Sequence, residues 1–101
     1  MEIQFIRELL KKKSIKWSTH CLERMSERDI SIEDVCTCIM SGEIIEDYPD
    51  DYPSPSCLVF GYSTKEAVLH VVVGTDSEVL YMITAYYPNT VKFMEDLKTQ
   101  R

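Results

Sequence analysis

The hydrophobic pattern of this chain changes its period once, at Gly42, and this change constrains the fold more than any other feature. Before Gly42, apolar residues recur at the three- and four-residue spacing of amphipathic helices. After it, segments rich in valine, isoleucine and tyrosine alternate with period two, as half-buried strands do. The 101 residues are enough for one ordinary domain. We therefore expect a single domain over residues 1–101, with helices first and strands after them.

Three helices are expected before Gly42, each with a recognisable signal at one end. Ser18 is a suitable N-cap for the second helix, and Ser31 with Asp34 forms a capping box at the start of the third. Gly42 is a favourable residue at the end of the third helix. The expected spans are Glu2–Lys12, about Thr19–Arg28 and Ser31–Gly42.

Four strands are expected after Gly42. Their spans are Glu43–Tyr48, Cys57–Tyr62, Ala67–Gly74 and Glu78–Tyr86. The proline-rich segment 49–55 is expected to be a loop, because proline cannot donate to a sheet ladder, and Thr90–Lys98 is expected to be a short C-terminal helix. Because short turns join the strands, we expect an α+β fold with the N-terminal helices on one face of a four-stranded antiparallel meander.

The third expected strand places a histidine opposite an aliphatic face. Leu69, Val71 and Val73 lie on one side of this strand, and His70 lies on the other. The aliphatic set is the better core candidate, so we expect His70 on the open face of the sheet, away from the helices. His70 is there either as a half-buried, hydrogen-bonded residue or as an acid–base group, since an ordinary histidine pKa of about 6.5 suits proton transfer near neutrality.

The second expected helix carries a stripe of basic side chains. His20, Arg24 and Arg28 are spaced four residues apart, so they share one side of the helix. Like charges at this spacing repel, and an anion between the arginines would remove that cost. The alternative is ion pairing, in which Glu27 pairs with Arg24 and other carboxylates pair with Arg28. The stripe alone leaves both interpretations open.

The last expected strand ends in polar and aromatic residues, among them Thr84 and Tyr86. Packing alone would account for a tyrosine there. A phenol at the edge of a sheet can also bind a phosphate or stack on a nucleic-acid base. We therefore regard Thr84 and Tyr86 as candidate substrate-binding residues.

The net charge of the chain disfavours binding to several kinds of partner. Eleven basic and 17 acidic residues give a net charge of −6, which disfavours charge-driven binding to nucleic acid or to an anionic membrane. Residues 1–30 hold more basic than acidic side chains, so any anion site is expected there. The acidic run 46–52 is dense enough for a hard cation, but it fits no calcium loop, and we expect it to be solvated. The acidic remainder suits a basic partner or only keeps the protein soluble.

Several functional classes lack the motifs they need in this chain. Its three glycines form no Gly-rich phosphate loop, and neither G-x-S-x-G nor H-E-x-x-H occurs. The four cysteines include no C-x-x-C pair, so we expect reduced thiols, no metal site and no cofactor. No signal peptide and no apolar run long enough to span a membrane is visible, so we expect a cytoplasmic protein.

Four blocks of the chain together follow a family pattern. They are His20-x-x-x-Arg24-x-x-x-Arg28-Asp29-Ile30-Ser31-x-Glu33-Asp34-Val35, Gly42-Glu43-Ile44-Ile45-Glu46-Asp47-Tyr48-Pro49, Leu69-His70-Val71-Val72-Val73-Gly74 and Ile83-Thr84-Ala85-Tyr86. In this order, across residues 17–90, they resemble a small bacterial and archaeal family of domains of unknown function. That family is similar in layout to the RelE-like toxins of the barnase–colicin–RelE group, and its members often lie beside a gene for an MqsA-like zinc-finger antitoxin.

The resemblance implies a function as well as a fold. It implies a RelE-like domain that acts as a metal-independent endoribonuclease, the toxin of a toxin–antitoxin pair, with RNA as substrate and an antitoxin as partner. It also implies that His20, Arg24, Arg28 and His70 lie near one site. Arginines suit the phosphate there, and the two histidines suit acid and base in either order. The alternative is a non-enzymatic protein-binding module that uses its acidic surface.

Overall fold

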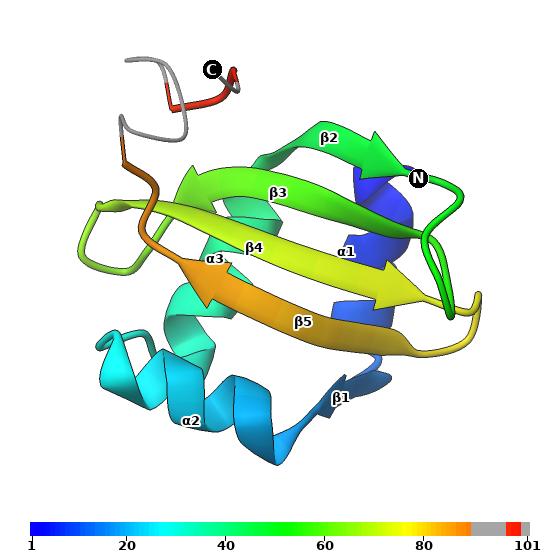
Figure 1. The fold of residues 1–101 in the computed structure, drawn as a ribbon, viewed down its shortest axis with the longest axis horizontal. Helices are drawn as coiled ribbons and strands as arrows, with labels where there is room; N and C mark the ends of the chain where they lie inside the picture. The colour runs from blue at the N-terminus through cyan, green and yellow to red at the C-terminus, as the bar shows by residue number, and fades with distance from the viewer. Residues whose placement is uncertain (90–96, 100–101) are drawn as a thin grey trace.

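The computed structural model describes residues 1–89 and 97–99. In this part of the chain, three helices and one short strand come before the other four strands (Figure 1). Along the chain they are α1 (Ile3–Lys11), β1 (Ile15–Trp17), α2 (Thr19–Glu27), α3 (Ile32–Ser41), β2 (Glu43–Tyr48), β3 (Ser56–Tyr62), β4 (Val68–Thr75) and β5 (Leu80–Tyr86). The helix expected over 90–98 lies outside the described residues except at its last two positions, where the chain bends.

The helix-start signals in the sequence act as expected. The Ser18 hydroxyl accepts a hydrogen bond from the backbone N–H of Cys21 at 3.0 Å, which caps α2. Ser31 and Asp34 form the reciprocal capping box at the start of α3. Gly42 ends α3 and leads directly into β2. These local hydrogen bonds set where the helices begin, so the expected boundaries of α2 and α3 are close to those observed.

The prediction of a four-stranded antiparallel meander is wrong. Within residues 1–89 and 97–99, the sheet has five strands in the order β1-β5-β4-β3-β2. The neighbours from β2 to β5 pair antiparallel, but β1 adds a parallel edge strand, with Ile15 opposite Leu80 and Trp17 opposite Met82. Strand β1 has only three residues, which are too few for a period-two alternation to be recognised in the sequence. Their pairing also depends on β5, which lies at the other end of the sequence.

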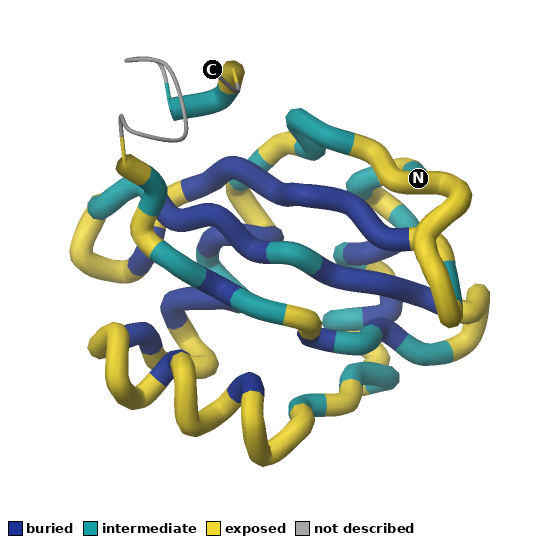
Figure 2. Tube along the Cα trace, viewed as in Figure 1, coloured by how far each residue is buried: buried dark blue, intermediate teal, exposed yellow. Residues whose placement is uncertain are grey.

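The core lies between the sheet and helices α1, α2 and α3. In Figure 1, α1 and α3 lie behind the sheet and α2 runs beside β5. Leu69, Val71 and Val73 of β4 face this core and are fully buried, as expected. Figure 2 shows that burial is concentrated in β3 and β4, whereas most of α2 is exposed. The main helix residues in the core are Ile6 and Leu9 of α1, Cys21 and Met25 of α2, and Val35, Cys38 and Ile39 of α3.

The sheet face away from the helices is covered in part, which corrects the expectation of an open face. His70 points to this face, yet it is 0% exposed. The backbone carbonyl of Leu97 lies against its ring. The loop 49–55 covers another part, because the N–H of Thr75 donates to the carbonyl of Pro55 at 3.1 Å. His70 is therefore placed on the expected side of the sheet but is shielded from solvent by segments distant in sequence.

Candidate functional site

The basic stripe of α2 is present, but only one of its members reaches the sheet. His20, Arg24 and Arg28 are exposed, while Cys21 and Met25 turn the other side of α2 into the core. Arg24 Nη1 lies 3.4 Å from Glu27 Oε2, so the ion-pair interpretation holds for Arg24. Both partners are more than half exposed, and such pairs contribute below about 1 kcal/mol. Within the described ranges, no hydrogen bond or ion pair joins His20 to another candidate residue.

Arg28 is held against the edge of the sheet. Its Nη1 donates to the carbonyl oxygen of Ala85 at 2.8 Å and to the hydroxyl of Thr84 at 3.2 Å. Because β1 pairs only with Leu80–Met82, this part of β5 has no neighbouring strand on that side in the described part of the chain. A guanidinium carries five N–H donors. Those on Nε and Nη2 of Arg28 have no hydrogen-bond partner among residues 1–89 and 97–99, so they remain available to a ligand.

His70 has a contact at each ring nitrogen, and these contacts identify its tautomer. Nε2 lies 2.6 Å from the carbonyl oxygen of Leu97, and Nδ1 lies 3.4 Å from the hydroxyl of Tyr86. A carbonyl oxygen only accepts, so Nε2 carries the proton and donates it. Nδ1 then accepts from the Tyr86 hydroxyl. Burial lowers the pKa of His70 below 6.5, against the opposing effect of the Leu97 carbonyl, so the ring is neutral at pH 7.

Thr84 contacts Arg28, and Tyr86 contacts His70. Thr84 lies opposite Val72 and Tyr86 lies opposite His70, so both project from the sheet face that carries His70. They are two residues apart on a regular strand, which separates them by about 7 Å. Burial raises the pKa of Tyr86, so its phenol is neutral at pH 7. These contacts group four predicted residues near the end of β5, which we call the β5 cluster: Arg28, Thr84, Tyr86 and His70.

The β5 cluster combines an exposed cation with a shielded acid–base pair. Arg28 can bind an anion, and the Tyr86 hydroxyl can pass its proton to Nδ1 of His70. His70 itself is 0% exposed, so a ligand would not contact it directly. The structure thus brings Arg28 and His70 to the same part of the sheet. It leaves His20 and Arg24 on the outer surface of α2.

Two neighbours of the cluster are not apparent from the sequence. The ring of Phe60 meets that of His70 edge-on, with centroids 6.0 Å apart. Lys98 places its Nζ 4.7 Å from the centroid of the Phe60 ring and 2.9 Å from Glu43 Oε1. An isolated lysine near the C-terminus carries no motif, so only the folded chain shows that it lies beside β3.

Other features of the described residues bear on metals and membranes. Among residues 1–89 and 97–99, no three histidine, cysteine or acidic side chains lie close enough to share a metal ion. Burial raises the pKa of the Cys38 and Cys57 thiols to about 12. In the same part of the chain, no helix has both the length and the apolar character that a membrane crossing requires. All four cysteines are free, namely Cys21, Cys36, Cys38 and Cys57.

Comparison with known proteins identifies a family but no characterised relative. The comparisons with curated proteins and with solved structures each found no match. A model of the family described as Domain of unknown function (DUF4258) matches residues 17–87, which run from the end of β1 to just beyond β5. This confirms the expectation of a family of domains of unknown function, and the relation to RelE-like toxins stays a prediction. Because the match covers well over half of the chain and includes the whole β5 cluster, the chain belongs to the DUF4258 family.

Proposed function

We propose that this domain is a metal-independent endoribonuclease that cleaves RNA at the β5 cluster. In the same proposal it is the toxin of a toxin–antitoxin pair, related to the RelE-like toxins. The observation that carries the proposal is the hydrogen bonding of the Arg28 guanidinium. Its guanidinium is anchored on Thr84 and Ala85, while the Nε and Nη2 donors have no partner in the described part of the chain. An anchored guanidinium of this kind is preorganised for a phosphate.

The β5 cluster supplies a route for the proton in this reaction. Metal-independent RNA cleavage needs a base for the ribose 2′-hydroxyl and a cation for the pentavalent phosphate. Arg28 binds the phosphate through Nε and Nη2. The Tyr86 hydroxyl takes the 2′-hydroxyl proton as it passes its own proton to Nδ1 of His70. The 2′ oxygen then bonds to phosphorus and the bond from phosphorus to the 5′ oxygen breaks.

The remaining proton transfers complete the reaction. The leaving 5′ oxygen takes a proton from water, and His70 returns its proton to solvent through Tyr86. The products are a 2′,3′-cyclic phosphate and a 5′-hydroxyl. His20 lies eight residues before Arg28, about 12 Å along the helix. In this scheme His20 and Arg24 contact the RNA strand beyond the cleaved bond, and His70 is a positioning and proton-accepting residue.

Cleavage of a single-stranded RNA oligonucleotide in the presence of EDTA tests the proposal. The natural chain should produce 2′,3′-cyclic phosphate ends, detected by mass spectrometry. Arg28→Ala and Tyr86→Phe should each lower the cleavage rate by about 10²- to 10³-fold, the usual effect of removing one preorganised donor. Tyr62→Phe is the matched control, because Tyr62 lies on the same sheet face outside the cluster, and it should cleave normally.

Two results would contradict this function. One is the absence of cleavage by the natural chain. The other is full activity in both Arg28→Ala and Tyr86→Phe. Arg28 also donates hydrogen bonds to Thr84 and Ala85 at the edge of β5, so its loss could destabilise the fold. Circular dichroism must therefore show that each variant is folded. Tyr86→Phe keeps the ring and removes only the hydroxyl, which keeps the test informative if Arg28→Ala unfolds.

A second candidate function is a non-enzymatic module that binds a basic partner. The complete burial of His70 favours it, because the imidazole cannot touch a substrate directly. The pairing of Arg24 with Glu27 and the net charge of −6 also favour it. Expression in a bacterial host separates the two functions. The nuclease should arrest growth and Tyr86→Phe should relieve that arrest, whereas a binding module should be harmless in both forms.

A further inference from the structure

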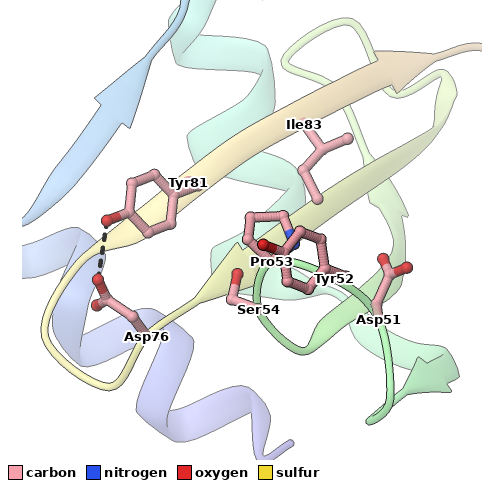
Figure 3. Close-up of a pocket in the computed structure, with 7 residues that line it drawn as sticks. All are labelled: Asp51, Tyr52, Pro53, Ser54, Asp76, Tyr81 and Ile83. Atoms are coloured by element: carbon pink, nitrogen blue, oxygen red, sulfur yellow. Dashed lines mark hydrogen bonds between the residues drawn. The ribbon is translucent and has the colours of Figure 1, made fainter.

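A pocket of about 340 Å³ lies on the sheet face away from the helices, near the start of β5. The loop 49–55 forms one side of it, and the turn between β4 and β5 forms another (Figure 3). It is separate from the β5 cluster, which lies toward the end of the same strand. We call it the Tyr52 pocket. Its lining consists of Asp51, Tyr52, Pro53, Ser54, Asp76, Tyr81 and Ile83.

The wall of the Tyr52 pocket is held in place by contacts with the sheet. Gly74 allows the loop to lie close, because a Cβ at this position would be 3.3 Å from both the Pro55 carbonyl oxygen and the Ser54 hydroxyl. The hydroxyl of the buried Ser56 donates to Asp51 Oδ2 at 2.6 Å. Together with the hydrogen bond between Thr75 and Pro55, these contacts form the pocket before any ligand arrives.

Two carboxylates give the pocket a negative charge. Asp76 Oδ2 accepts from the Tyr81 hydroxyl at 2.8 Å, and its Oδ1 accepts from the backbone N–H groups of Glu78 and Val79. The hydrogen bond from Tyr81, followed by those from the backbone, lowers the pKa of Asp76, so it is ionised at neutral pH. Asp51 Oδ1 has no hydrogen-bond partner within residues 1–89 and 97–99. A cation in the pocket can therefore pair with Asp51, while Asp76, whose two oxygens already accept hydrogen bonds, adds negative charge.

The aromatic lining of the pocket also suits a cation. Tyr52 is 92% exposed, so its ring contributes little to the stability of the fold. Figure 3 shows this ring beside its sequence neighbour Pro53, with Tyr81 on the other side of Pro53 in this view. A guanidinium stacks on an aromatic face and pairs bidentately with a carboxylate, which an ammonium group does less well. The volume is near the lower end of the roughly 300–1,000 Å³ of ligand pockets, which suits one long side chain.

We propose that the Tyr52 pocket binds an arginine side chain of a basic protein partner, with the guanidinium stacked on Tyr52 and paired with Asp51. The complementary charge of this acidic chain favours such a partner. The proposal does not rest on RNA cleavage, because the pocket and the β5 cluster share no residue.

A capped peptide with the sequence Gly-Gly-Arg-Gly-Gly tests the proposal by NMR titration of the ¹⁵N-labelled chain. The amide signals that shift should be those of residues 51, 52, 54, 76, 81 and 83. A second peptide with citrulline in place of arginine has nearly the same shape without the charge, and it should bind at least about fivefold more weakly. Neither measurement involves RNA, so its outcome is independent of the nuclease test.

Matched variants separate this pocket from general attraction to an acidic surface. Tyr52→Ala should weaken binding of the arginine peptide by about two- to fivefold, whereas Tyr52→Phe should keep it. Asp51→Asn should weaken binding by a similar factor, and Asp50→Asn, the same change at an exposed neighbour outside the pocket, should not. Equal binding of the citrulline peptide, equal effects of both aspartate variants, or shifts spread over the whole acidic surface would overturn the proposal.

Discussion

Replacement of Asp34 by asparagine tests a buried contact that joins α3 to the turn between β3 and β4. Asp34 is 2% exposed. Its Oδ2 accepts from the backbone N–H of Ser31 at 2.9 Å. Its Oδ1 accepts from the backbone N–H of Thr64 at 3.0 Å and from the Thr64 hydroxyl. An asparagine amide has nearly the same shape but only one acceptor oxygen, so at least one of these donors loses its partner.

The pKa of Asp34 gives the size of the expected effect. Burial by itself would raise this pKa, but the hydrogen bonds from Ser31 and Thr64 outweigh it and lower the pKa from 3.8 to about 2. At 1.36 kcal/mol per pKa unit, the ionised form stabilises the fold by about 2 kcal/mol. We expect Asp34→Asn to lower the free energy of unfolding at pH 7 by about 2–3 kcal/mol, which includes the cost of an unpaired buried donor. The corresponding fall in Tm is about 10–14 °C.

The same contact predicts a pH dependence. The pKa of Asp34 is lower in the folded chain than in the unfolded chain, so its stabilisation is complete above about pH 4 and is lost as the pH falls toward 2. Urea unfolding followed by circular dichroism should show the natural chain and Asp34→Asn converging between pH 5 and pH 2. Glu33→Gln, an exposed neighbour with the same charge change, should stay within about 0.5 kcal/mol of the natural chain. A penalty for Asp34→Asn that is unchanged at pH 2.5, or an equal penalty for Glu33→Gln, would refute the reasoning.

Three further predictions concern packing, thiol reactivity and histidine. Gly61→Ala should lower the free energy of unfolding by about 1–3 kcal/mol in urea, because its Cβ would lie 2.5 Å from the Cys38 carbonyl oxygen; an unchanged stability would contradict this contact. Iodoacetamide at pH 8, followed by mass spectrometry, should alkylate the half-buried Cys36 first and leave Cys38, with a pKa of about 12, unmodified until the chain unfolds. Burial lowers the pKa of His70, so the unfolded chain takes up this proton first and stability should decline as the pH falls below about 6.5. His70→Gln should lack that decline, and ¹⁵N NMR of the natural chain should find the ring proton on Nε2 at pH 7.

The residues of the β5 cluster could be singled out from the sequence, but their convergence could not. Arg28 stands out by its spacing on a helix, and Thr84 and Tyr86 by their place at the end of a strand. That Arg28 reaches Thr84 depends on how α2 packs beside β5, a contact between residues far apart in the chain. The pairing of Arg24 with Glu27 is different, because residues three apart on a helix are always neighbours, and this alternative was therefore open to sequence reasoning.

The burial of His70 could not be predicted from the local sequence pattern. Alternation along β4 correctly predicts the face on which the side chain lies, because successive residues of a strand point to opposite sides. It does not predict exposure, which here depends on the Leu97 carbonyl and on the rings of Phe60 and Tyr86. The Tyr52 pocket is a similar case, since its two carboxylates come from separate loops that no sequence spacing connects.

By itself, the sequence determined the helix starts, the strand spans after Gly42 and the inward face of β4. Each of these depends on hydrogen bonds or side-chain periods within a few residues. Only the tertiary structure decided that β1 joins the sheet in parallel, that Asp34 binds Thr64 and that His70 is shielded. The physical reason is that these contacts join segments far apart in the chain. Their partners meet only after the whole sheet has taken its register, and short-range periodicity carries no information about that register.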